Sequence, residues 1–307
     1  MAKKQINPDK VMAEATVESN RQIGYDFYKL TITFEGPPAK TFANTQPGQF
    51  VELDLSTAST PSTENTPEKL RNGSERLVLL RRPFSFCDLT CESDKTSAEI
   101  LYRVIGPGTL RMSNLSAGDY LSVIGPLGIG FSVPAGKKTA VLVTGGMGAG
   151  PMEHLAKVLA QKHNDIKVTA FAGAKSRDQL PFENVSQSLR EFTRYGTESF
   201  IATDDGSAGE KGFVTDCMAD WLDKNSLPTE EMIIYSCGPE PMLAKVSQIA
   251  GQHNIDCQVS MERMMACGIG LCQGCAVECR AADSTETVYK MCCKEGPVFD
   301  SKEVVFS

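Results

Sequence analysis

Thr139-Ala-Val-Leu-Val-Thr-Gly-Gly-Met-Gly-Ala-Gly-Pro-Met152 is an apolar run followed by a glycine-rich turn. The apolar run predicts a buried strand, and residues 152–162 predict a helix, with Pro151 near its first turn, where a missing N–H costs little. Glycines between a strand and a helix let the backbone approach a pyrophosphate, whose charge the helix N-terminus favours. The turn is not a standard dinucleotide fingerprint, so a plain strand–helix connection is the alternative.

The alternation of strand and helix continues beyond this stretch. Further strands are expected at 167–172, 200–203, 232–236 and 257–261, with helices at 214–224 and 241–252. Such alternation predicts a parallel sheet covered on both faces, which binds ligands at its carboxyl edge. The stretch Tyr235-Ser-Cys-Gly-Pro-Glu-Pro-Met242 should lie at that edge beside the first turn. The candidate nucleotide contacts are Gly145, Gly146, Gly148, Pro151, Cys237, Gly238 and Pro239.

The sequence before residue 135 has a different pattern, of short alternating runs broken by Gly, Pro and Asn. Several short strands separated by turns predict an antiparallel barrel or sandwich. Residues 56–75 are rich in Ser, Thr, Pro, Asn and Glu, so we expect an exposed loop there. Arg81-Arg-Pro-Phe-Ser85 suits a phosphate, although a lone motif of this kind is more often a surface turn. The expected strands are 27–34, 49–54, 77–80, 99–105 and 119–124.

Near the C-terminus, Cys267-Gly-Ile-Gly-Leu-Cys-Gln-Gly-Cys275 has the spacing C-x4-C-x2-C. This spacing is typical of plant-type [2Fe–2S] proteins, in which a fourth cysteine follows later in the chain. The glycines allow the backbone to wrap tightly and to point N–H groups at the sulfurs. Candidates for the fourth ligand are Cys279, Cys292 and Cys293. A zinc site or inert buried thiols are the alternatives, although the second C-x2-C-like pair of most zinc motifs is missing.

The overall composition excludes several classes of protein. The chain has 307 residues and a formal net charge of -7, which argues against nucleic acid as a partner. No apolar run approaches the roughly 20 residues that span a bilayer, and Met1 to Pro8 has no apolar core behind it, so neither a membrane segment nor a secretory signal is expected. Eleven cysteines in such a chain point to metal binding rather than disulfides, and to a cytoplasmic protein.

Taken in order, these motifs resemble the ferredoxin reductase superfamily, and most of all the electron-transfer subunits of class 1B dihydroorotate dehydrogenases. The resemblance covers about residues 22–306 apart from the insertion at 56–75. It implies an α+β multidomain fold: an FAD-binding antiparallel β-barrel domain over 8–134, a doubly wound NAD(P)-binding α/β domain over 135–256, and a small cysteine-rich [2Fe–2S] module over 257–307.

The resemblance also implies the site residues. Asp204 and Asp205 match the family's nucleotide domain, and residues 125–131 match the segment that leaves the barrel. Cys293-Lys-Glu-Gly-Pro-Val-Phe299 matches the stretch with the fourth cluster cysteine, which favours Cys293 beside Cys267, Cys272 and Cys275. If the pair lies in a strand, Cys292 should face the opposite side. The implied FAD contacts are Arg82, Pro83, Phe84, Ser85, Leu101, Tyr102, Arg103, Gly108 and Thr109.

The implied function is electron transfer from an FMN-containing catalytic subunit that oxidises dihydroorotate, through [2Fe–2S] and FAD, to NAD+ in pyrimidine biosynthesis. The two subunits would form a heterotetramer. Flavin must lie between the other two centres, because the cluster exchanges single electrons and nicotinamide only a hydride. No catalytic acid or base is expected, and the three histidines should lie on the surface. Lys175 and Arg177 suit a 2′-phosphate, so NADP also fits.

Two rival functions differ from this one. The first is a related flavin and iron–sulfur subunit that serves a hydrogenase or a ferredoxin-dependent complex. Bifurcating transhydrogenase relatives usually have Asp as the first cluster ligand, whereas this chain has Cys267, which favours the dihydroorotate type. The second is a zinc-stabilised binding module without enzymatic activity.

Overall fold

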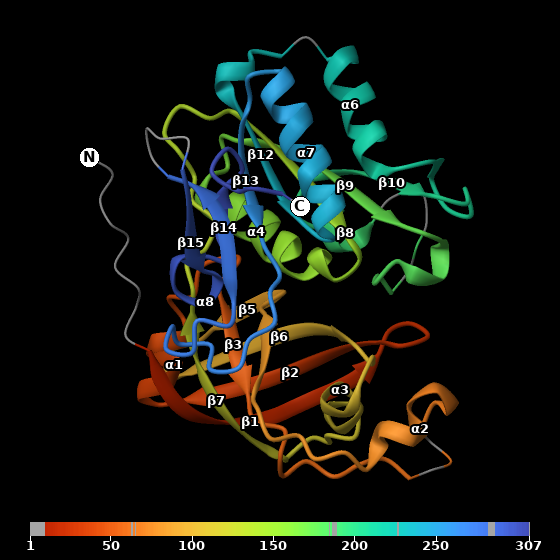
Figure 1. The fold of residues 1–307 in the computed structure, drawn as a ribbon, viewed down its shortest axis with the longest axis vertical. Helices are drawn as coiled ribbons and strands as arrows, with labels where there is room; N and C mark the ends of the chain where they lie inside the picture. Colours follow the sequence, from red (N-terminus) through yellow and green to blue (C-terminus); the bar gives the residue numbers. More distant parts are fainter. Residues whose placement is uncertain are drawn as a thin grey trace.

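The computed structural model describes residues 10–62, 64, 66–183, 185, 189–225, 227–281 and 286–306, so the expectation for Met1 to Pro8 lies outside the described residues. Two seven-stranded sheets build the two halves of the molecule, and a two-stranded sheet lies beside them (Figure 1). The N-terminal half is an antiparallel sheet. The C-terminal half is a mostly parallel sheet between helices.

The antiparallel sheet has the strand order β4-β3-β7-β1-β2-β6-β5. Alternate side chains of its strands, such as Leu30, Ile32 and Phe34, point into one core. In the described part of the chain β4 and β5 are edge strands, so the expected barrel is a curled half-barrel. Pro83 fits β4, because one side of an edge strand needs no ladder hydrogen bonds. The strands are β1 (Val11–Gln22), β2 (Phe27–Glu35), β3 (Phe50–Leu53), β4 (Arg82–Ser85), β5 (Asp88–Cys91), β6 (Lys95–Arg103) and β7 (Tyr120–Leu127), and the helices are α1 (Pro37–Phe42), α2 (Glu68–Ser74) and α3 (Pro107–Met112).

Two local expectations in this half were wrong. Residues 77–80 form no strand: Leu77 and Leu79 are 78% and 82% exposed, and only Val78 enters the core. The insertion at 56–75 is also not simply an exposed loop, because Ala58 and Thr66 are buried and α2 lies against α3. Composition predicted neither result, since both depend on contacts with other parts of the chain.

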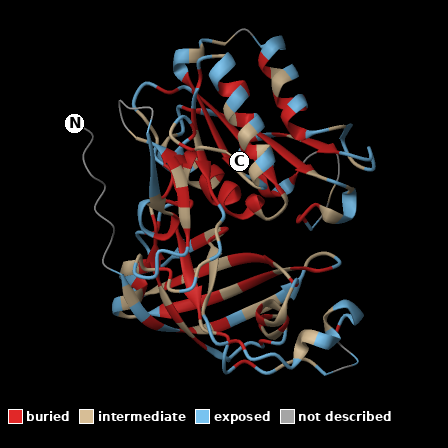
Figure 2. Cartoon of the chain, in the orientation of Figure 1, coloured by how far each residue is buried: buried red, intermediate tan, exposed pale blue. Residues whose placement is uncertain are grey.

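The parallel sheet has the order β11-β10-β9-β8-β12-β13-β16, and only β16 runs antiparallel. Val141 and Val143 of β8 face α6 and α7, whereas Ala140 and Leu142 face α4, which explains the continuous apolar run of this strand. Helices therefore cover both faces, as predicted (Figure 2). The strands are β8 (Thr139–Gly145), β9 (Lys167–Ala174), β10 (Glu198–Thr203), β11 (Glu210–Lys211), β12 (Met232–Cys237), β13 (Asp256–Ser260) and β16 (Val298–Asp300), and the helices are α4 (Ala149–Lys162), α5 (Arg190–Thr193), α6 (Val214–Lys224) and α7 (Glu240–Gln252).

The cysteine-rich segment is anchored to the parallel sheet at both ends. It leaves from β13 and returns as β16, which pairs with β13. Between them, β14 (Ala276–Arg280) and β15 (Thr287–Met291) form the two-stranded sheet, and α8 (Cys292–Glu295) follows. A boundary at residue 257 thus falls inside β13, and the segment shares the core of the nucleotide half.

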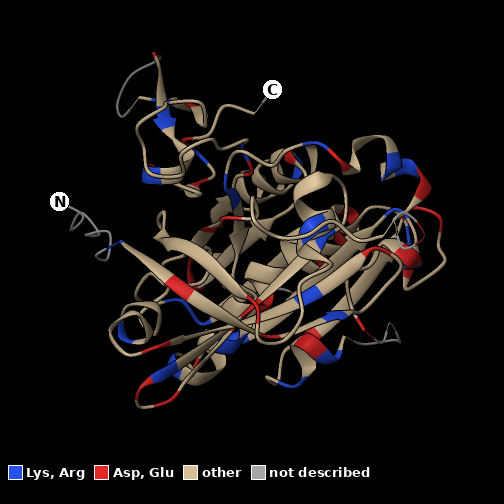
Figure 3. Cartoon of the chain, turned by 90° about the horizontal axis from the view of Figure 1, so that it is seen from below, with Lys and Arg blue, Asp and Glu red and all other residues tan. Residues whose placement is uncertain are grey.

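Lys and Arg residues are interspersed with Asp and Glu residues along the ribbon (Figure 3). Among the described residues, no helix has both the length and the apolar character needed to cross a membrane.

His154 corrects the expectation that all three histidines lie on the surface. It lies in α4, is 3% exposed, and has no hydrogen-bond partner for Nδ1 among the described residues. Burial lowers the pKa of His154 to about 4, because an imidazolium would lose its hydration there. The folded protein therefore holds this side chain neutral.

We expect His154 to destabilise the protein in mild acid. The pKa is about 4 in the folded state and roughly 6.5 in the unfolded chain, so as pH falls through 6.5 only the unfolded state takes up the proton. Between pH 7.5 and 5.5 this costs about 1 kcal/mol of unfolding free energy. Urea titrations followed by Trp221 fluorescence measure the free energy of unfolding at both pH values. On going from pH 7.5 to 5.5, His154→Gln should lose less of this free energy than the wild type. His163→Gln is the matched control, and an unchanged loss in His154→Gln would contradict the assignment.

Candidate functional site

Two turns meet at the carboxyl edge of the parallel sheet. β8 and β12 are neighbours, with Thr144 opposite Cys237. A Cβ on Gly148 would lie 1.9 Å from the carbonyl oxygen of Cys237, and one on Gly145 would lie 2.9 Å from Cδ of Pro239. Side chains at these glycines would push the two turns apart. The structure thus brings the predicted nucleotide contacts together, with Pro151 buried in the first turn of α4.

The loops after β9 and β10 lie at the same edge and are tied together by Ser207. Its N–H and hydroxyl donate to Oδ1 of Asp205 at 2.9 and 2.6 Å, which lowers the pKa of that exposed carboxyl. The Ser207 hydroxyl in turn accepts the N–H of Arg177 at 2.8 Å. Asp204 and Asp205 are therefore at the nucleotide edge, two strands away from β8.

A cavity of ≈ 930 Å³ lies where the segment after β9 faces the half-barrel. That volume is in the range of ligand pockets. Nε of Arg103 and Nζ of Lys69 lie 3.0 and 3.2 Å from the same carboxylate oxygen of Asp26, and all three residues line the cavity with Ser176 and Arg177. Lys69 belongs to α2, so the insertion supplies part of the wall. The sequence indicated Arg103 but not Asp26 or Lys69, because nothing local connects them.

The expected FAD residues gather on β4, on β6 and in the first turn of α3. Arg82 donates to the carbonyl oxygen of Leu80 at 2.8 Å, and a Cβ on Gly108 would lie 3.3 Å from Cγ of Arg82. The Thr109 hydroxyl accepts the N–H of Ile105 at 2.9 Å and closes the turn. Arg82, Gly108 and Thr109 thus form one patch.

The aromatic members of the set lie deeper. The rings of Phe84 and Tyr102 meet edge to face, with centroids 6.3 Å apart. Tyr102 is buried in the core and its hydroxyl donates to Oδ1 of Asn20 at 2.9 Å. The Tyr102 side chain is therefore engaged inside the half-barrel, whereas Leu101 lies beside α4.

The cysteine loop presents N–H groups to its sulfurs. The N–H of Cys272 points at Sγ of Cys267, and the N–H of Cys293 points at Sγ of Cys275, each at 3.4 Å. Burial opposes ionisation of Cys267, but N–H groups of Cys272, Ile269 and Leu271 outweigh it and lower the pKa of this thiol to about 6. The loop favours a thiolate, the form that binds metal.

Cys293 lies in the same site. Burial and the neighbouring Cys275 raise the pKa of its thiol to about 12, while the N–H of Gly270 opposes the rise. A metal would reverse this effect, because it binds and stabilises the thiolate. Four sulfurs with N–H donors around them fit a [2Fe–2S] cluster, and Cys267, Cys272, Cys275 and Cys293 are the candidates to hold it.

The sequence analysis expected Cys292 to face away from the cluster because the two cysteines would lie in a strand. That premise was wrong, since Cys292 and Cys293 begin the one-turn helix α8. Cys292 nevertheless points away, because its thiol donates to the carbonyl oxygen of Met261 at 3.4 Å inside the core. Cys279 is buried on β14, the outgoing strand expected at Val277.

Glu52 is a residue at this site that the sequence did not reveal. It lies on β3, is fully buried, and neither carboxylate oxygen has a hydrogen-bond partner among the described residues. Burial raises the pKa of Glu52 to about 7 although Arg81 opposes the rise. A Cβ on Gly268, which has φ +66°, would lie 2.5 Å from Oε1 of Glu52. Since Glu52 is opposite Pro83, β3 connects the cysteine loop to β4.

Comparison with known proteins agrees with this arrangement. Residues 142–248 match the model of the oxidoreductase NAD-binding domain, and residues 262–305 match that of the iron–sulfur cluster binding domain of dihydroorotate dehydrogenase B. The structure of an NADH-dependent reduced ferredoxin-NADP oxidoreductase superposes with a TM-score of 0.72 at 24% identity, over 100% of this chain and 92% of that chain. The cytochrome b5 reductase domain of Ulva prolifera nitrate reductase superposes with a TM-score of 0.58 at 16% identity, over 81% of this chain and 95% of that chain. These two structures share the fold, and the matched domains define an oxidoreductase with an NAD-binding domain and an iron–sulfur cluster binding domain.

Curated relatives identify the family within this class. The chain is 39% identical to the dihydroorotate dehydrogenase B (NAD(+)) electron transfer subunit of Listeria monocytogenes serotype 4a, over 96% of this chain and 99% of that one. It is 34% identical to the corresponding subunit of Caldanaerobacter subterraneus, over 95% of this chain and 98% of that subunit. The chain belongs to the family of dihydroorotate dehydrogenase B electron-transfer subunits.

The two adjacent cysteines should respond differently to substitution. Cys293→Ser should remove most of the roughly two irons per chain, because it takes away one of four convergent thiols. Cys292→Ser should keep them, because its sulfur contacts the core. Iron analysis and visible absorbance measure both variants after identical purification. The reverse result would assign the ligand to Cys292. If both variants kept their full iron content, Cys279 would become the candidate for the fourth ligand.

Arg82→Ala should weaken FAD binding and leave the iron content unchanged. A lost contact between a guanidinium and a phosphate is worth roughly 1.5–3 kcal/mol, or about 10- to 100-fold in the dissociation constant. Flavin fluorescence after dilution measures the release of FAD. The exposed Arg190 provides the control variant Arg190→Ala, and equal retention by both variants would contradict the prediction.

Proposed function

We propose that this chain carries electrons from an FMN-containing dihydroorotate dehydrogenase catalytic subunit to NAD+. The [2Fe–2S] cluster would be held by Cys267, Cys272, Cys275 and Cys293, and FAD would lie between the half-barrel and the parallel sheet. One observation carries the proposal: the loop with the convergent thiols rests on β3, the neighbour of the strand with the FAD motif. The two redox sites would therefore be adjacent.

The bound groups supply the redox chemistry, since a cluster exchanges single electrons, nicotinamide exchanges a hydride and a flavin does both. The protein binds and orients them. N–H groups of the cysteine loop stabilise thiolates, and Arg82 offers its guanidinium to a phosphate of FAD. The turn from Gly145 to Gly148 offers the N-terminus of α4 to the nucleotide's pyrophosphate, with Cys237, Gly238 and Pro239 alongside. No side chain has to act as an acid or base.

The cavity favours NAD over NADP. Lys69 and Arg103 already pair with Asp26, and Arg177 donates to the carbonyl oxygen of Val185 at 2.7 Å. Asp178 and Glu183 add negative charge to the same wall. A 2′-phosphate would have to compete with these partners, whereas a ribose hydroxyl would not.

The name shared by the curated relatives implies a catalytic partner subunit. We propose that the partner is the FMN-containing subunit and that the assembly is a heterotetramer. We also place the protein in the cytoplasm, because none of the eleven cysteines forms a disulfide, which fits a reducing compartment.

The proposed division of work can be tested by separating the subunits. The purified chain should oxidise NADH with ferricyanide as acceptor, yet should not turn over dihydroorotate, because the proposal assigns FMN and the dihydroorotate site to the partner subunit. Adding the catalytic subunit encoded in the same genome should produce dihydroorotate-dependent reduction of NAD+. Cys293→Ser should abolish that coupled activity. Turnover of dihydroorotate by the chain alone, or no coupling with the catalytic subunit, would disprove the proposal.

A further inference from the structure

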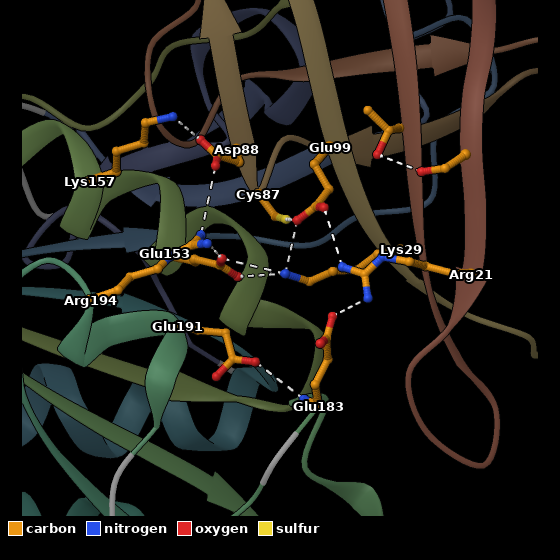
Figure 4. A network of polar contacts seen from close by, with 12 residues as sticks. Arg21, Lys29, Cys87, Asp88, Glu99, Glu153, Lys157, Glu183, Glu191 and Arg194 are labelled. Atoms are coloured by element: carbon orange, nitrogen blue, oxygen red, sulfur yellow. Dashed lines mark hydrogen bonds and ion pairs between the residues drawn. The ribbon is translucent and has the colours of Figure 1, made fainter.

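Six charged residues meet between the half-barrel and the parallel sheet, and we call them the interdomain charge cluster (Figure 4). Its centre is Lys29 on β2, whose side chain is 5% exposed. Nζ of Lys29 lies 2.9 Å from Oε1 of Glu99 on β6 and 3.3 Å from Oε2 of Glu153 on α4. Glu153 is 1% exposed, so this pair crosses between the two halves in a nearly water-free place. The six residues are Lys29, Asp88, Glu99, Glu153, Lys157 and Arg194.

Two more cations complete the interdomain charge cluster. Arg194 pairs with Glu153 and lies 3.7 Å from Oδ2 of Asp88. Lys157 pairs with the same Asp88 and donates to the carbonyl oxygen of Leu89 at 2.6 Å. Each half of the molecule therefore contributes both signs to the six residues. Arg21 on β1, which lies 3.8 Å from Oε2 of Glu99 and pairs with Glu183, adds a further cation at the edge of the interdomain charge cluster.

The interdomain charge cluster is not a metal site. Sγ of Cys87 and carboxylate oxygens of Glu99 and Glu153 lie within 4.8 Å of one another, which would suit a cation. The ammonium of Lys29 already pairs with both carboxylates. Burial alone would lower the pKa of Lys29, but Cys87, Glu153 and Glu99 raise it above its ordinary value, so the ammonium stays charged.

The position of Glu153 connects this cluster to both expected cofactor sites. The glycine turn opens α4, and Glu153 follows in the same helix, which is rigid over this length. Between them Gly150 packs on the half-barrel: a Cβ there would lie 3.4 Å from Cβ of Cys87 and 3.6 Å from Cβ of Leu101. Cys87 comes shortly after the Arg82–Ser85 strand, and Glu99 comes shortly before Leu101. The interdomain charge cluster thus sits directly behind the place where a nicotinamide and a flavin would meet.

We propose that Lys29 is a positioning residue for hydride transfer, which fixes the nucleotide turn of α4 relative to the flavin strands through Glu153. This inference rests on the proposed function. Hydride transfer needs reacting atoms about 3–3.5 Å apart, and a misplacement of about 1 Å costs on the order of 100-fold in rate. Removing either residue takes away one of the two ion pairs of the other, because Glu99 remains beside Lys29 and Arg194 remains beside Glu153. The buried charge is then less well compensated, which the structure relieves by moving apart or admitting water.

The test is a double-mutant cycle on the FAD- and cluster-loaded chain. Stopped-flow measurement of flavin reduction by NADH should show a roughly 10- to 100-fold slower step in Lys29→Met and in Glu153→Gln, with FAD content and NADH affinity within about threefold of the wild type. The double variant should be no slower than the single ones, because each residue acts through the other. Lys138→Met is the matched control, since Lys138 pairs with Asp165 inside the nucleotide half, at the surface.

Two measurements that do not depend on turnover accompany the cycle. The long-wavelength absorbance of a stacked nicotinamide and flavin should weaken in Lys29→Met but not in Lys138→Met. In calorimetry of the FAD-free protein, the single unfolding transition of the wild type should split in Lys29→Met as the halves uncouple. If Lys29→Met does not fold, the absorbance and the calorimetry are measured on Glu153→Gln instead, with the same expected results.

The outcomes separate this inference from the proposed function. Normal flavin reduction in all variants, or strictly additive effects in the double variant, would overturn the role of Lys29 and leave the proposed function standing. A wild-type chain that binds no FAD, or whose flavin NADH does not reduce, would instead overturn the proposed function.

Discussion

The packing of α4 against β5 and β6 is the contact on which the rest of the molecule depends. Gly150 lets the helix approach Cys87 and Leu101, and the ion pairs of Glu153 and Lys157 then fall where the half-barrel presents Lys29 and Asp88. A buried charge that loses its partners costs several kcal/mol, so these ion pairs disfavour arrangements that separate the two halves. The observed arrangement sets the cavity and brings the glycine turn towards the flavin strands.

The cysteine segment depends on the same framework in a different way. It has no core of its own, and it is held by β13 and β16 in the parallel sheet while its loop rests on β3 of the half-barrel. A thiol loop needs rigid N–H donors to favour thiolates, and these two anchors keep the backbone of the loop in place. The buried carboxyl of Glu52 lies at the junction. The proposed cluster, flavin and nucleotide sites thereby follow one another from β3 through β4 to the edge of β8 and β12.

The segment at 56–75, which the sequence analysis treats as an insertion, has a structural consequence. Its helix α2 lies against α3 and brings Lys69 to Asp26 at the cavity wall. A long surface insertion adds little entropic cost to folding. This one extends the wall without disturbing the sheet order.

The sequence by itself determined the features that depend on near neighbours in the chain. The strand–glycine–helix pattern after Thr139, the bounds of α6 and the C-x4-C-x2-C spacing all follow from local periodicity and turn geometry. Only the tertiary structure decided which helical histidine is buried, that Leu77 and Leu79 are exposed, and that Cys292 and Cys293 start a helix. It alone brought Lys29 to Glu153, Lys69 to Asp26 and Glu52 to Gly268. These pairs are far apart in the sequence, and the free energy of burying a charge or a bare carboxyl depends on partners that no local pattern specifies.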